Sequence, residues 1–291
     1  MQGTSEQPVR SRSLAGLLTG SVVFAAILSM LIPACALRAS AETVPVKHLE
    51  GTIHGFLDLR SPDGTVVASG DLVQFTHGGQ VTTETLFRFK DGSVDDETTV
   101  FSQRGSFQLI SDHHVQKGPA FPHPMDVLID CRSRQVTVRS VGKDGKEEVK
   151  TDRLNLPPDL ANGLVPFVLE NLPPDTTGKA VSMLVATPKP RIVKLVVSSR
   201  GEEQFSVVGS SRRAIHYEIK IDLGGVAGVV APLIGKQPPD IQAWVIGGQA
   251  PTFIREQGPL YPEGPMMTIE LASPTFPDTA KSDTNQTSAE K

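Results

Sequence analysis

In the middle of the chain (86–141), apolar and polar side chains alternate with a period of two. Phe87 and Phe89 flank a basic residue, and Val127 and Ile129 recur two positions apart between acidic neighbours. Side chains of a β-strand point alternately to its two faces, so this period indicates strands with one packed face and one solvated face. The pattern is typical of antiparallel strands, and it predicts a meander.

One run within this meander sets an expectation for which residues share a face. Counting in twos from Phe107 and Leu109 places His113 and Val115 on the same face. Asp95–Glu97, just after a hairpin turn, is expected to be a solvated charged edge that discourages strand addition.

The same alternation continues on both sides of the meander. It recurs over 49–60 and 213–223, and turns rich in Gly, Pro and Asp, such as Ser61–Gly64, separate the runs. We therefore expect a mainly β fold, a large and strongly curved antiparallel sheet that forms a half-barrel meander. One short helix should lie on its concave face.

The helix is predicted where the period changes, over 157–171. Four apolar residues there have helical spacing: Leu160, Leu164, Phe167 and Val168. Pro166 lies inside this run and should kink or interrupt the helix. An amphipathic helix in a β chain needs a sheet to cover, so these apolar side chains should face the concave side.

The first 41 residues have the features of an export signal. Arg10 and Arg12 precede an apolar run, and Ala39-Ser40-Ala41 fits a cleavage site, so the mature chain should begin at Glu42. Residues 42–272 then form a single β-rich domain, and 273–291, which are poor in apolar residues, a disordered tail. The predicted location is the periplasm or cell envelope.

Two alternatives to cleavage remain open, and both would bring the protein to a membrane. Cys35 follows a segment similar to a lipobox, although Pro33 is atypical of one, and lipidation there would anchor the chain. The apolar run is also long enough to be retained as a membrane span. Otherwise no membrane association is expected.

Composition excludes some classes of function. The net charge is −4 at pH 7, and no basic stripe interleaved with aromatic residues is present, so nucleic acid is not an expected partner. After signal removal Cys131 is the only cysteine, which precludes an intramolecular disulfide. It is expected to be a small buried residue on the same face as Ile129.

The candidates for chemistry are weak. Asp112, His113 and His123 could form a hydrolase-like or metal-dependent site, but His113 and its neighbour His114 should point to opposite faces of one strand. No metal and no cofactor are therefore expected. Gly224–Gly235 lacks the glycine spacing of a nucleotide-binding turn, so it remains either a cover for the sheet or a lid over an apolar ligand.

The closing segments resemble a known fold. Ile241–Val245, which contains Trp244, and then Phe253–Tyr261 are similar to the final strand pair of the bacterial lipoprotein carriers and related exported half-barrel proteins. Leu156–Leu164 is similar to their crossing helix. The resemblance is topological and transfers no function. The apolar stripe of the helix is either core or the lining of a site for an apolar ligand, and the expected ligand-binding residues are Leu160, Leu164, Phe167, Val168 and Trp244.

The function expected from these observations is non-catalytic: an exported cell-envelope protein that binds an apolar small molecule, a lipid or a partner on the concave face. One alternative is the enzyme that uses Asp112, His113 and His123. A further alternative is a structural envelope protein with no pocket. The volume enclosed by the concave face separates these hypotheses, because specific sites are hollow and mostly apolar.

Overall fold

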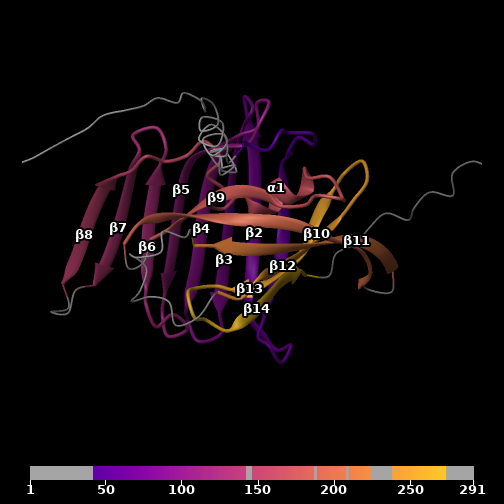
Figure 1. Ribbon diagram of the computed structural model, residues 1–291. Helices are drawn as coiled ribbons and strands as arrows, with labels where there is room; N and C mark the ends of the chain where they lie inside the picture. The colour runs from indigo at the N-terminus through magenta and orange to yellow at the C-terminus, as the bar shows by residue number, and fades with distance from the viewer. Residues whose placement is uncertain (1–41, 142–145, 187–188, 208–209, 224–237, 273–291) are drawn as a thin grey trace, which may run out of the picture. The chain divides into compact units, whose positions relative to one another are not determined.

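The computed structural model describes residues 42–141, 146–186, 189–207, 210–223 and 238–272. Within this part of the chain, fourteen strands form one antiparallel sheet that is not closed, which confirms the predicted mainly β fold (Figure 1). The strands are β1 Ile53–Arg60, β2 Val66–His77, β3 Gln80–Phe89, β4 Val94–Ser102, β5 Gln108–Lys117, β6 Met125–Asp130, β7 Gln135–Val141, β8 Glu147–Arg153, β9 Lys179–Val185, β10 Arg191–Val207, β11 Ser210–Asp222, β12 Ile241–Ile246, β13 Thr252–Pro259 and β14 Met266–Leu271.

The sheet consists of two meanders, β1–β8 and β9–β14, which are joined because the first strand, β1, pairs with the last, β14. It runs β8-β7-β6-β5-β4-β3-β2-β1-β14-β13-β12-β11-β10-β9, so β8 and β9, which neighbour each other in sequence, form the two opposite edges. Strands β9–β11 cross in front of β2–β6 at a steep angle (Figure 1), and residues of both halves share one buried apolar cluster. The sheet therefore curls over itself, and we call the enclosed side its inner face.

The single helix among the described residues, α1, is shorter than predicted. It spans Val165–Glu170, not 157–171. Gly163 has a φ of +63°, which ends any helical path through the preceding residues, and Pro166 lies in the first turn of α1, where it interrupts nothing. The prediction of a kink at Pro166 was therefore wrong.

The segment before α1 pairs with the edge of the sheet. Ala161 N donates to Ser182 O at 2.8 Å, and Ser182 N donates to Asp159 O at 3.1 Å. The side chain of Asn162 continues the pairing, because its Oδ1 accepts from Leu184 N and its Nδ2 donates to Leu184 O. These bonds occupy backbone groups of β9 that would otherwise form a free edge.

Residues 44–48 cross the inner face and hold α1, and we call this segment the strap. Val46 N donates to Gly105 O, and Phe107 N donates to Val44 O, both at 3.0 Å. The amides of Lys47 and His48 both donate to Oδ1 of Asn171, which directly follows α1. The strap thus fixes the short helix that the sheet alone would hold only through side chains.

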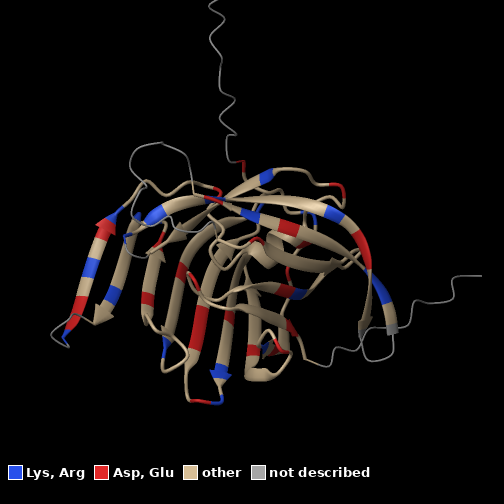
Figure 2. Cartoon of the chain, turned by 60° about the horizontal axis from the view of Figure 1, so that its bottom comes forward, with Lys and Arg blue, Asp and Glu red and all other residues tan. Residues whose placement is uncertain are grey.

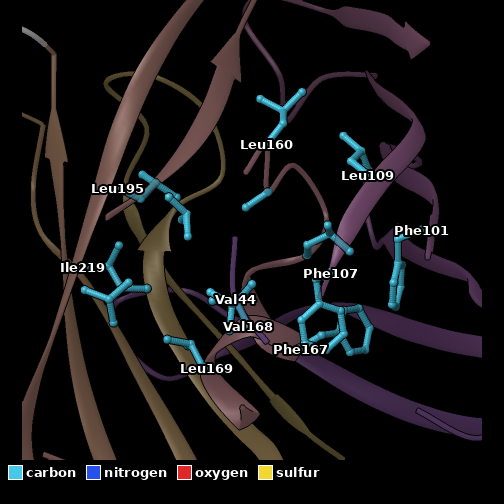
Figure 3. Packing of buried hydrophobic residues seen from close by; sticks show 14 of the residues in the cluster. Val44, Phe101, Phe107, Leu109, Leu160, Phe167, Val168, Leu169, Leu195 and Ile219 are labelled. Carbon is cyan, nitrogen blue, oxygen red and sulfur yellow. The ribbon is translucent and has the colours of Figure 1, made fainter. Parts of the chain in front are cut away.

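Apolar side chains fill the inner face at its two ends. The larger cluster joins β3–β7, the strap, α1 and β9–β12, and Figure 3 shows α1 residues such as Phe167 and Val168 packed among them. The smaller cluster, at the far end of β1–β3 and β14, contains Leu57, Leu59, Ala68, Phe87 and Met267. Polar side chains separate these two clusters.

Candidate functional site

The four helix-stripe residues expected to bind a ligand lie in the larger apolar cluster. Leu160, Leu164, Phe167 and Val168 are all buried, with Phe167 only 7% exposed. The ring of Phe167 lies 5.0 Å from that of Phe101. The cavity beside these residues has a free volume of about 10 Å³, roughly that of one water molecule. The structure thus gives them a packing role, and a ligand role for them stays a prediction.

Trp244, the fifth expected ligand-binding residue, lies apart from the other four. Its neighbours Ala243 and Val245 are buried in the larger cluster, so Trp244 points to the opposite face of β12. There it stacks on His216 with ring centroids 4.6 Å apart, and its Nε1 donates to Glu203 Oε2 at 3.0 Å. The structure therefore does not bring Trp244 together with the helix stripe.

The residues of the enzyme alternative do not converge either. Asp112 is buried on the inner face, whereas His113 lies on the outer face, where its Nε2 is 3.0 Å from Asp126 Oδ1. His123 is exposed in the connection between β5 and β6. As predicted, His113 and His114 point to opposite faces.

The inner face carries five ionisable side chains in its middle, which we call the acidic interior cluster: Asp95, Glu97, Asp112, His114 and Glu256. They come from β4, β5 and β13. Figure 2 shows acidic positions in red on several strands of the curved sheet. This arrangement corrects the expectation that Asp95–Glu97 is a solvated edge, because Asp95 and Glu97 face inward on a central strand.

A β-bulge places the β5 members of the cluster. The pairing of β4 with β5 shifts between Val100 and Phe101, so Ile110 is an extra residue in β5. Beyond it the alternation is reversed: Asp112 and His114 face inward and His113 faces outward. The expectation that His113 shares a face with Leu109 was therefore wrong.

Hydrogen bonds tie part of the cluster together. His114 Nε2 lies 2.7 Å from Asp95 Oδ1, and its Nδ1 lies 3.9 Å from Glu97 Oε1. Gln116 Nε2 donates to Asp95 Oδ2 at 2.9 Å and to Leu260 O at 3.0 Å. The contact with Leu260 fastens β5 to the residue that follows β13.

Burial and charge repulsion shift the proton affinities of the cluster upward. Burial, with repulsion from Glu97, raises the pKa of Asp112 to about 7, and burial alone raises the pKa of Glu256 to about 7. Burial also raises the pKa of Glu97, and the charges of Asp95 and Glu256 add to that effect. Asp112 and Glu256 therefore exchange protons near neutral pH.

His114 supplies the positive charge of the cluster. Burial by itself lowers its pKa, but the charge of Glu97 and the hydrogen bond and charge of Asp95 outweigh burial and raise the pKa to about 9. The imidazolium side chain keeps 24% of its surface exposed and the Glu97 side chain 30%, so solvent reaches the cluster. The cluster thus contains one imidazolium group and four acidic groups.

Two buried side-chain atoms of β2 and β3 have no hydrogen-bond partner among the described residues. Gln74 Oε1 and Thr83 Oγ1 lie on the inner face of β2 and β3, in side chains of residues that are only 1% and 4% exposed. Unpartnered buried polar atoms are rare in folded proteins and need an explanation.

Two other polar networks lie on the inner side of the sheet. Ser182 Oγ lies within 3.0 Å of both Asp159 carboxylate oxygens, and Lys194 Nζ donates to it at 2.8 Å. Ser182 is fully buried, so this Ser–Lys–Asp contact fixes the segment before α1 and offers no accessible nucleophile. Burial, with repulsion from Glu50, raises the pKa of Glu170 to about 8. The carboxyl groups of Glu50 and Glu170 therefore share a proton.

The described residues contain no group of three His, Cys, Asp or Glu side chains arranged to hold a metal ion. Cys131 packs partly buried against the larger cluster, as expected, and burial raises the pKa of its thiol to about 11. The predicted apolar loop Gly224–Gly235 lies outside the described residues, so neither interpretation of it is tested.

Comparisons with family models, with curated proteins and with solved structures find no match to this chain. The resemblance to lipoprotein carriers therefore stays a prediction. In the part of the chain that the structure describes, no helix has the length and apolar character to span a bilayer. The class that the fold defines is an open, curled antiparallel sheet with an acid-lined interior.

Proposed function

We propose that this is an exported, non-catalytic binding protein that holds a small polar molecule at the acidic interior cluster. The observation that carries the proposal is the acidic interior cluster itself, because its four carboxyl groups face inward and His114 is the only cationic side chain paired with them in the described chain. Buried carboxyl groups without enough counter-charge are unfavourable unless protons or a bound polar molecule compensate them.

The location on the inner face follows the original expectation of a concave binding site, but it moves the ligand away from the helix stripe. The helix end is filled by Phe167 and its neighbours and leaves a volume of only about 10 Å³. The middle of the inner face, in contrast, keeps Glu97 and His114 partly exposed. The middle region therefore suits a polar ligand. The packed helix end leaves little room for an apolar ligand or a lipid.

Binding is favoured over catalysis by the pairing within the cluster. His114 is engaged by Asp95 and Glu97, and Asp112 accepts a hydrogen bond from Thr99 Oγ1 at 2.8 Å. Both ring nitrogens of His114 face carboxyl groups, so neither faces a nucleophile, and the buried Ser182 is in a different network. Export is supported by the basic head, apolar run and cleavage site of the first 41 residues.

Native mass spectrometry of the protein purified without denaturant tests this proposal. Wild type should carry a small molecule that is lost in Glu256→Leu and retained in Glu84→Leu, a matched change at an exposed position of β3. Circular dichroism verifies that both variants fold, and Glu97→Gln serves as a second, milder change. The proposal fails if no molecule is retained and no member of a diverse metabolite library raises the melting temperature of wild type. A molecule lost only in Phe167→Ala would place the site at the helix end instead.

A further inference from the structure

Strand β8 forms one edge of the sheet and contributes little to its core. Among the described strands it pairs only with β7, and no described strand lies beyond it (Figure 1). Six of its seven side chains are exposed, and only Asp152 is partly buried. The backbone groups on its outer side are thus left unpaired by the described strands, and they can hydrogen-bond to a further strand.

The sequence of β8 limits which strand can pair with it. It reads Glu-Glu-Val-Lys-Thr-Asp-Arg, so it carries both signs of charge within seven residues. Two copies of one strand can pair antiparallel about a two-fold axis perpendicular to the sheet. Each side chain then keeps its face, so one central residue lies opposite its own copy. Residues at equal distances before and after this centre lie opposite each other.

Most of these centres are unfavourable. A pair centred on any charged residue of β8 places that charge opposite itself, and like charges directly opposite each other are destabilising. Only Val149 and Thr151 remain as centres. The Thr151 centre brings together one kind of opposite-charge pair, Lys150 with Asp152 of the second copy.

The Val149 centre gives the better match. Glu148 then lies opposite Lys150 of the second copy, and Lys146, just before the strand, lies opposite Asp152. Each of these contacts occurs twice by symmetry, and no like charges are opposed. The Val149 side chain, which is 58% exposed in the single chain, packs against its own copy.

We propose that β8 pairs antiparallel with β8 of a second copy of this chain, with Val149 at the two-fold axis. Each copy supplies both an acidic and a basic side chain to the contact, as a two-fold interface requires. The assembly ends at two copies, because the segment around Asn162 occupies the other edge, on β9. The same charges that oppose pairing with other strands thus select this register.

Charge reversal tests the pairing without disturbing the core, because the replaced side chains are exposed. Sedimentation velocity of the purified chain over a concentration series should show a dimer that weakens with added salt, since its charge pairs are exposed. Glu148→Lys and Lys150→Glu each oppose like charges, and each should weaken dimerisation at least tenfold at an unchanged melting temperature. Glu84→Lys, at an exposed position of β3, should leave dimerisation unchanged.

Two further variants bring the dimer back or trap it. The double variant Glu148→Lys/Lys150→Glu restores opposite charges and should dimerise like wild type. An equal mixture of the two single variants should form a heterodimer, because each supplies the charge that the other lacks. Val149→Cys should form a disulfide between two copies on mild oxidation, whereas Glu147→Cys, on the same face but away from the axis, should not.

The register and the partner can each be overturned. A wild-type chain that stays monomeric up to about 500 μM, a range that covers weak contacts of small area, overturns the inference and leaves the edge to another strand or to none. A dimer that neither reversal weakens also overturns it, because the copies would then meet elsewhere. A dimer lost in Lys150→Glu but kept in Glu148→Lys overturns the Val149 centre in favour of Thr151.

Discussion

Two regions of the same inner face bury side chains of different kinds. At the helix end, α1 and the strap fill the space over β3–β7 with apolar side chains, and little volume is left. In the middle, the sheet buries carboxyl, hydroxyl and amide groups, some of which find no partner in the described chain. The helix end is filled by its own apolar side chains, whereas the middle keeps ionisable groups with few counter-charges, and this difference is the reason for proposing the site there.

Thr99 links the two regions. Its Oγ1 donates to Asp112 in the cluster, and Gly163, which precedes α1, packs directly over it. The packed end therefore supports the acidic interior cluster from one side. Substitutions at the helix end should lower the free energy of unfolding. Substitutions in the acidic interior cluster should mainly alter how that free energy depends on pH. A substitution at the contact between Gly163 and Thr99 should have both effects.

Phe167→Ala should have the largest effect, because it empties the centre of the packed end. We expect a loss of about 3–5 kcal/mol in the free energy of unfolding, measured by urea denaturation. Phe56→Ala is the matched control, because Phe56 is 58% exposed, and it should cost about 1 kcal/mol or less. A small loss for Phe167→Ala, with an apolar fluorescent probe bound by wild type, would restore the helix stripe as a ligand site.

Gly163→Ala should follow, because it disturbs the junction. The residue has a φ of +63°, and an added Cβ would lie 1.9 Å from Thr99 Oγ1. The strained backbone and the clash together should cost about 2–4 kcal/mol. Gly64→Ala isolates the backbone part, because its φ is +83° and an added Cβ would meet no atom within 4 Å, so about 1 kcal/mol is expected. Equal losses of unfolding free energy in the two variants would show that the Thr99 side chain moves away from the added methyl group at no cost.

The acidic interior cluster should make the protein less stable as the pH rises. A carboxyl group whose folded pKa is raised stabilises the fold fully below its unfolded pKa, near 4, and that contribution is lost as the pH passes the folded value of about 7. For His114 the contribution is present below about 6.5 and lost as the pH passes about 9. The melting temperature should therefore fall continuously between pH 5 and pH 9.

Asp112→Asn tests whether the loss of stability with rising pH comes from the acidic interior cluster. The amide can still accept the hydrogen bond from Thr99 but cannot ionise, so the variant should lose less stability than wild type between pH 5 and pH 8. Each unit of pKa shift corresponds to about 1.4 kcal/mol, so the effect should be readily measured by melting at several pH values. Asp63→Asn, at an exposed turn, should leave the slope unchanged near neutral pH. A stability that rises with pH would contradict the assignment.

The strands could be predicted from the sequence because a strand with one buried face keeps apolar residues at every second position. Phe87, Val127 and Ile129 lie inward as expected. The helix stripe was also grouped correctly as one apolar surface, although only part of it is helical. Local pattern is sufficient for both because each depends on neighbouring residues along the chain.

The acidic interior cluster could not be predicted because polar residues at alternate positions do not reveal which face is enclosed. Asp95 and Glu97 have the period of a solvated face, and only the curl of the sheet places them inside. The bulge at Ile110 adds a second difficulty, because it reverses the alternation for Asp112 and His114 without a Gly or Pro to mark it. The available signal was Asp95, Glu97 and Thr99 in register with Phe101, an apolar residue of the same face.

The two edges of the sheet have a consequence for the solubility of this protein. An open sheet offers free backbone groups at each edge to strands of other molecules. The residues around Asn162 occupy those groups on β9, and β8 carries charge at five of its seven positions, seen as red and blue bands in Figure 2. A fourteen-stranded sheet can thus stay open in a crowded compartment without becoming a template for fibrils.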